Sequence, residues 1–173
     1  MKAIVIYSTL TGNTQKIAEA IAGALPMGTP CTSIENMPEE LDSYDLVFAG
    51  YWVDKGGPDA KSKELLGKLT NPHVALFATL GAYPDSDHAK KSLDNGAEAL
   101  RYPDREAGRF ICQGKVDPKL VEAMSKQFPQ GHPHGMNPER IKRLKDASVH
   151  PDEQDCDRAQ AFARDVLHRL EGK

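Results

Sequence analysis

The sequence predicts one α/β domain of the doubly wound class, in which a parallel sheet lies between two layers of helices. Two continuous apolar segments, Ala3–Tyr7 and Leu46–Gly50, are typical of strands that are buried on both faces. Stripes of apolar residues at helical spacing separate the predicted strands, and this alternation favours a parallel sheet with right-handed crossovers. The length of 173 residues suits a single domain spanning 1–173.

The first predicted helix follows a polar stretch and has five apolar residues on one face: Ile17, Ala18, Ile21, Ala22 and Leu25. We expect it to end at Pro26–Gly28 and to be followed by a weak strand at residues 31–34. Gly57–Pro58 is then expected to open a helix, since proline is tolerated in a first turn. Residues 74–78 are strongly apolar and predict the fourth strand.

In the second half of the chain, Ser86 is expected to begin a helix, and residues 110–112 form a short fifth strand. Asp117–Pro118 has the composition of a helix cap and first turn. Residues 129–150 are rich in Pro, Gly, His and Lys, which predicts a surface insertion with one short helix after Asn137–Pro138. The last helix has one apolar stripe: Ala159, Phe162, Ala163, Val166, Leu167 and Leu170.

Composition and charge exclude several classes of function. The formal net charge is −3, so we expect no nucleic-acid partner. No apolar run approaches the ~20 residues of a membrane helix, and the opening segment is too short for a signal peptide, so we expect no membrane association. Cys31, Cys112 and Cys156 include no CxxC pair, which favours reduced thiols in a cytoplasmic protein without a metal site.

The loop after the first strand has the composition of an anion-binding site. Its hydroxyl groups, its glycine and the N-terminus of the following helix offer donors to a phosphate. The alternative is an ordinary helix cap, because the same residue types favour caps. The spacing fits neither a Walker loop nor a GxGxxG fingerprint, so a terminal monophosphate suits it best. The candidate residues are Thr9, Leu10, Thr11, Gly12, Asn13 and Thr14.

This segment resembles the FMN-phosphate loop of flavodoxins, whose pattern is Ser/Thr-x-Thr-Gly-x-Thr. The resemblance covers residues 1–114 and the last helix, and it implies a five-stranded sheet in the order 2-1-3-4-5. It implies FMN as the cofactor and electron transfer to a redox partner protein. Residues 50–56, 81–84 and 112–114 resemble more specifically the flavodoxin-domain subgroup that includes the BilS type, encoded beside bilirubin reductase.

Two further loops at the carboxyl ends of strands carry aromatic residues that suit a flat flavin ring. By resemblance, Trp52 and Tyr83 would lie on either side of the ring. The edges of aromatic rings also pack at strand ends without a ligand, which is the alternative for each of them. The other candidate residues in these loops are Tyr51, Val53, Asp54, Leu80 and Gly81.

The sequence departs from many flavodoxins, which have a glycine between the Trp and the Asp of this loop. In those proteins the glycine peptide turns over as the flavin gains its first electron. Val53 occupies that position here, and a β-branched residue disfavours positive φ. The turnover would therefore have to move to Gly56 or Gly57, or two-electron chemistry would be favoured.

Three functions remain open. The first is an FMN-binding electron carrier that supplies a partner reductase. The second is an NAD(P)H-dependent flavin or quinone reductase, and the third is a flavin-free accessory module of a reductase. No catalytic residue is assigned, because the flavin would carry the chemistry. A basic cluster at residues 140–145 is expected to be a solvated helix face, with an acidic partner or a carboxylated substrate as the alternative.

Overall fold

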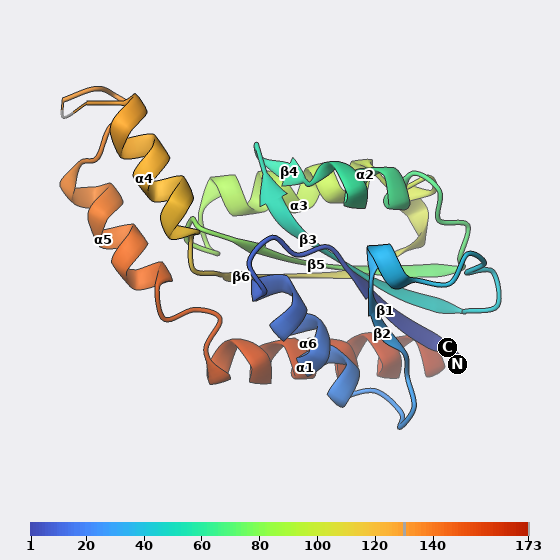
Figure 1. Ribbon diagram of the computed structural model, residues 1–173. Coiled ribbons are helices and arrows are strands. Elements are labelled where there is room, and N and C mark those ends of the chain that lie inside the picture. The colour runs from blue at the N-terminus through green and yellow to red at the C-terminus, as the bar shows by residue number, and fades with distance from the viewer. Residues whose placement is uncertain (130, 173) are drawn as a thin grey trace.

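The computed structural model describes residues 1–129 and 131–172 and contains one twisted parallel sheet (Figure 1). Its order is β2-β1-β3-β5-β6, and a two-residue strand, β4 (Gly57–Pro58), pairs antiparallel with β3. Without β4, this is the predicted order 2-1-3-4-5. The parallel strands are β1 (Ala3–Tyr7), β2 (Cys31–Ser33), β3 (Leu46–Asp54), β5 (His73–Leu80) and β6 (Glu106–Gln113).

Two layers of helices cover the sheet, as Figure 1 shows. One face is covered by α1 (Asn13–Gly23) and α6 (Glu153–Glu171), and the other by α2 (Ala60–Leu66) and α3 (Asp87–Glu98). Two short 3₁₀ segments occupy Ile34–Asn36 and Pro103–Arg105. No helix in the described part of the chain has the length and apolar character needed to cross a membrane.

Alternate residues of each central strand pack into two separate cores. In β1, Val5 packs with the α1 and α6 side, whereas Ile4 and Ile6 pack with α2. All three side chains are fully buried. This double burial explains why the strand is a continuous apolar run and does not alternate with polar residues.

The structure corrects two predicted boundaries. The third strand continues to Asp54, where the sequence predicted an end at Gly50. Gly57–Pro58 opens no helix, because it pairs with the end of β3 to form a hairpin. The helix begins at Ala60 instead, since the side chain of Asp59 accepts a hydrogen bond from the Ser62 amide.

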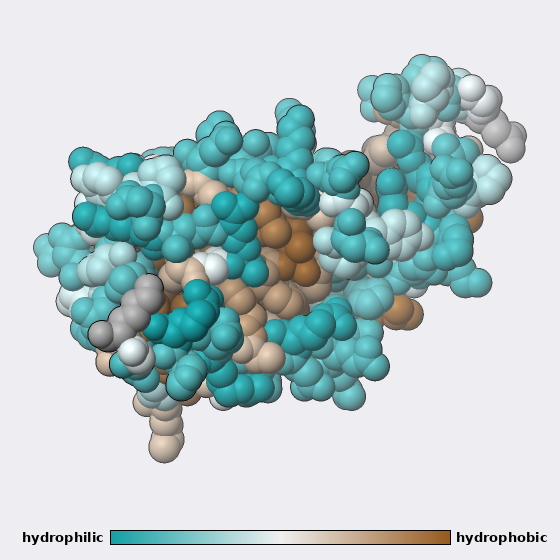
Figure 2. All heavy atoms as spheres, turned by 180° about the vertical axis from the view of Figure 1, so that it is seen from behind, coloured by the Kyte–Doolittle hydropathy of each residue, from teal (hydrophilic) through white to brown (hydrophobic). Residues whose placement is uncertain are grey.

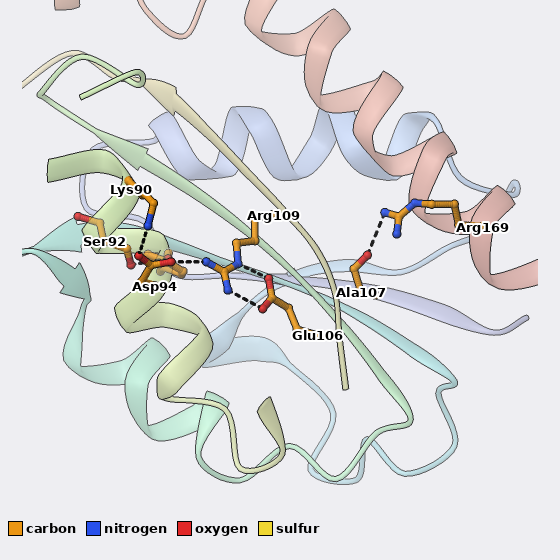
Figure 3. Close-up of polar contacts among 8 residues, drawn as sticks. Lys90, Ser92, Asp94, Glu106, Ala107, Arg109 and Arg169 are labelled. Carbon is orange, nitrogen blue, oxygen red and sulfur yellow. Dashed lines mark hydrogen bonds and ion pairs between the residues drawn. The ribbon is translucent and has the colours of Figure 1, made fainter. Parts of the chain in front are cut away.

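Strand β6 is also longer than predicted, and charged residues cover its free edge. Arg109 forms an ion pair with Asp94 of α3 at 2.6 Å and a second one with Glu106 (Figure 3). Lys90 reaches the other oxygen of Asp94 at 2.8 Å. Charged side chains along an edge strand oppose pairing with another chain.

Helices α4 (Pro118–Gln127) and α5 (Pro138–Ala147) project together beyond the end of the sheet (Figure 1). We call residues 118–149 the arm. The predicted short helix after Asn137–Pro138 is confirmed as α5, and Asn137 caps it by accepting from the Arg140 amide at 2.8 Å. Seen from behind in Figure 2, the arm stands apart from the body and is mostly hydrophilic, whereas apolar residues gather in the middle of the body.

Candidate functional site

The carboxyl ends of β1, β3, β5 and β6 meet at one edge of the sheet, where they form a groove of about 120 Å³. We call it the edge groove. Ligand pockets that enclose a small molecule usually measure about 300–1,000 Å³, so this groove can cover only part of a larger ligand. The predicted site residues that line it are Leu10, Thr11, Asn13, Trp52, Val53, Leu80 and Gly81.

The loop after β1 turns sharply at Gly12, which has a φ of 93°. A residue with a Cβ is strained in this left-handed region, so glycine suits the position. The Gly12 amide donates to Oγ1 of Thr9 at 2.9 Å, which holds the loop closed. Leu10 and Thr11 lie exposed at its tip.

The first turn of α1 is not capped by a side chain. In contrast, α2, α3, α4, α5 and α6 each have an Asp, Ser or Asn side chain that accepts from their first turn. The N-terminus of α1 therefore presents free amide donors and the positive end of the helix dipole. This argues against the ordinary helix cap that the sequence left open, and it suits an anion beside Gly12.

Thr14 differs from the other loop residues, because its side chain is fully buried. Its hydroxyl forms a 2.9 Å hydrogen bond with the hydroxyl of Thr79 at the end of β5. Thr14 thus joins the start of α1 to the sheet. Thr11, which is exposed, is the better placed of the two hydroxyls to meet a ligand.

The buried carboxylate of Asp59 anchors the start of the loop after β1. Asp59, only 3% exposed, accepts from the hydroxyl of Ser8 at 3.0 Å and from the hydroxyl of Ser62 at 2.8 Å. The Ser8 amide also donates to the carbonyl of Gly50 at 2.9 Å. The end of β1, the end of β3 and the start of α2 are therefore fixed relative to one another.

Tyr51 and Trp52 are neighbours in β3 and face opposite sides of the strand. Trp52 is half-buried and lines the edge groove. Tyr51 is fully buried, and its hydroxyl donates to the carbonyl of Ser92 in α3 at 3.1 Å. The prediction that Tyr51 lies in a ligand-side loop is wrong, because the strand continues past it and its side chain belongs to the core.

The hairpin that follows β3 turns at Lys55 and Gly56, both with left-handed φ, 49° and 82°. Val53 keeps a strand conformation and pairs with Pro58. Asp54 lines a separate hollow beside α3 rather than the edge groove. The carbonyl of Gly56 accepts from the Asn95 side chain at 2.7 Å, which anchors this peptide to α3.

The loops after β5 and β6 complete the groove. The Gly114 amide donates to the carbonyl of Leu80 at 2.8 Å, and the Gln113 side chain donates to the carbonyl of Gly81 at 3.2 Å. Asn13 donates to the carbonyl of Lys115 at 2.9 Å, which connects the loop after β1 to the loop after β6. Sequence reasoning missed Lys115, Val116, Asp117 and Leu120 as site residues, although their place after the last strand was a usable signal.

Tyr83 lies outside the edge groove, in a second and larger cavity of about 440 Å³ that α4, α5 and the segment after β5 form together. We call this the arm cavity. The Tyr83 hydroxyl donates to Asp146 of α5 at 2.8 Å. This hydrogen bond raises the pKa of Tyr83. Hydrogen bonds from Lys142, the stronger influence, and from Tyr83 lower the pKa of Asp146 below its usual value. The structure does not bring Trp52 and Tyr83 together around one ligand.

Histidines gather at two places in and beside the arm. His132 stacks on Phe128 with ring centroids 4.9 Å apart, in an exposed part of the arm. His150 lies 2.5 Å from Oδ2 of Asp155, a buried carboxylate that also pairs with Arg158 and accepts from the Asp152 amide. The protein itself satisfies Asp155, so this cluster is a structural contact between the end of the arm and α6.

Comparisons with known proteins agree with this architecture. Residues 4–164 match the family model described as the flavodoxin domain. The chain is 31% identical over 170 residues to the flavodoxin-like domain-containing protein BilS of Clostridioides difficile, covering 96% of this chain and 97% of that protein. It is 27% identical to the BilS protein of Clostridium symbiosum, covering 94% of each.

Solved structures agree at the level of the fold. Flavodoxin 2 from Bacillus cereus has a TM-score of 0.59 and 17% identity, with 98% of this chain and 99% of that one covered. A flavodoxin from the domain Archaea has a TM-score of 0.58 and 14% identity, with 99% of each chain covered. The family match and the BilS relatives together show that the chain belongs to the flavodoxin domain family, in its BilS-type subgroup.

Proposed function

We propose that this protein binds FMN at the edge groove and carries electrons to a partner reductase. The observation that carries the proposal is the uncapped start of α1, directly beside the Gly12 turn. Free amide donors and the helix dipole there suit a phosphate group. The flavodoxin family supports a flavin as the molecule that carries this phosphate.

The residues present fit such a cofactor in two places. The amides of the first turn of α1 and the Thr11 hydroxyl would hold the phosphate. Trp52 offers one aromatic face to the ring, since it is half-buried and lines the groove. Electron storage and transfer would come from the flavin itself, while the protein binds and orients it. Tyr83 would not cover the second face while it is bonded to Asp146.

Exposed apolar residues at the groove support contact with a protein partner. Leu10 is 59% exposed and Leu120 is 50% exposed, and both line the groove. Apolar side chains that stay exposed around a shallow site suit an interface that forms and dissolves. A shallow groove also leaves part of a bound ring open for electrons to leave.

The decisive experiment is an absorbance titration of the purified protein with FMN. We expect one FMN per chain with shifted flavin bands. Thr11→Val should lower the affinity about tenfold, because one charge-assisted hydrogen bond to the phosphate is lost. Thr32→Val in β2 removes a hydroxyl that does not line the groove, so this matched control should bind FMN like the parent protein.

If the purified protein does not bind FMN, the proposal is overturned and the flavin-free accessory module is favoured. Rapid reduction of the FMN-loaded protein by NADPH or NADH alone would instead favour an NAD(P)H-dependent flavin or quinone reductase over an electron carrier. Equal affinities of Thr11→Val and the parent protein would refute the phosphate position even if FMN binds.

A further inference from the structure

The arm cavity contains an unusual combination of apolar walls and cationic groups. Helix α4 contributes Leu120, Val121 and Met124 to it, and α5 contributes Arg140, Arg143 and Leu144. The volume of about 440 Å³ falls within the usual range for small-molecule sites. The segment after β5 completes its lining with Tyr83, Ser86 and His88.

The arginines lie on the face of α5 that turns toward α4. Arg140, Arg143 and Leu144 are spaced three and four residues apart, so they share this face. Lys142 and Lys145 do not line the cavity. An amphipathic helix normally places apolar residues on its inner face, so two arginines there need a separate explanation.

Neither arginine is neutralised by a carboxylate in the described part of the chain. Glu122 pairs with Lys126, and Asp146 pairs with Lys142 and accepts from Tyr83. Glu139, in the first turn of α5, is exposed and forms no ion pair with either arginine. Arg140 donates to the carbonyl of Gly135 at 3.1 Å, which leaves Arg143 as the guanidinium with the most donors open to a ligand. Overall the arm has six Lys or Arg residues and three Asp or Glu residues.

The geometry points to a second ligand site in the arm cavity, which takes an apolar molecule bearing a carboxylate. Apolar rings or chains would lie against α4, and the carboxylate would pair with Arg143. Arginine binds carboxylates through two parallel hydrogen bonds, which gives this group selectivity over a neutral one. The flexible thioethers of Met124 and Met136 let the walls adapt to irregular shapes.

The cavity is next to the edge groove, since Gly81, Val116 and Leu120 line both. A molecule in the arm cavity would therefore lie beside whatever occupies the groove. The inference itself does not depend on FMN, because neither Arg143 nor Met124 belongs to the groove. It goes beyond the electron carrier proposed above, since it gives this chain a small-molecule ligand of its own.

The test uses three probes of one shape: pyrene-1-butyrate, pyrene-1-butanol and pyrene-1-butylamine. Isothermal titration calorimetry with the whole 173-residue chain measures each affinity. We expect the carboxylate to bind one per chain and at least about tenfold more tightly than the alcohol, with the amine weakest. Equal affinities for the carboxylate and the alcohol would overturn the proposal.

Variants locate the binding site. Arg143→Gln should remove most of the preference for the carboxylate, whereas Lys145→Gln, on the same helix but outside the cavity, should keep it. Val121→Phe fills the cavity and should weaken all three probes. Trp52→Ala should leave pyrene-1-butyrate binding unchanged; a loss with this variant would place the probe in the edge groove and refute the arm site.

Discussion

The hydroxyl of Ser8 donates a 3.0 Å hydrogen bond to Oδ1 of Asp59, across 51 residues of sequence. This buried contact joins the last residue before the loop after β1 to the cap of α2. The start of the candidate phosphate loop is thus fixed by hydrogen bonds among Ser8, Asp59 and Ser62, none of which belongs to the loop itself.

Asp59→Ala should lower the free energy of unfolding by about 2–4 kcal/mol, because the α2 cap is lost and two buried hydroxyls lose their acceptor. Asp59→Asn keeps an acceptor oxygen and a good capping residue, so it should cost much less. Urea unfolding of both variants measures the difference. A similar loss in both would mean that the negative charge, and not the hydrogen-bond geometry, holds the network.

Gly12→Ala should weaken FMN binding about tenfold, since an alanine at a φ of 93° shifts the amides that face the phosphate. Gly28→Ala is a matched control, because Gly28 has a φ of 88° and, like Gly12, open space around its Cβ position. Both variants should lose about 1–2 kcal/mol of stability. Equal FMN affinities in the two variants would contradict the assignment of the loop.

Trp52→Ala should lower FMN affinity about tenfold or more through lost stacking and burial. Tyr51→Phe should leave FMN binding unchanged and cost about 1 kcal/mol of stability, because it removes only the hydrogen bond to Ser92. Fluorescence titration and thermal unfolding measure the two effects. Weaker FMN binding in Tyr51→Phe would restore the original sequence prediction for this residue.

Stability should fall as the pH rises from about 9 to about 11. Burial raises the pKa of Cys31 to about 11, and it raises the pKa of fully buried Cys112 still further. The folded state therefore keeps protons that the unfolded thiols lose, so the stability is fully present below the unfolded pKa and declines above it. Urea midpoints at several pH values measure the decline, and the double variant Cys31→Ala, Cys112→Ala should show less of it.

Sequence patterns predicted the parallel strands because these strands are buried on both faces and form apolar runs. The order of the strands was an implication of the resemblance to flavodoxins. The sequence patterns gave wrong element boundaries outside the buried strands. Gly57–Pro58 reads as the first turn of a helix, yet it forms the return strand of a hairpin. Local composition does not predict that Pro58 pairs with Val53. The sequence placed the end of β3 at Gly50, so Val53 was not expected to belong to a strand.

The sequence by itself determined the alternation of strands and helices and the family, and it predicted an anion-binding loop after the first strand. These depend on short-range patterns: residue types in fixed order, apolar spacing and caps. Only the tertiary structure decided that Tyr51 belongs to the core, that Tyr83 is bonded to Asp146 and that α5 turns two arginines toward α4. Each of these depends on which distant segment packs against the residue, and that contact forms only when the chain is folded.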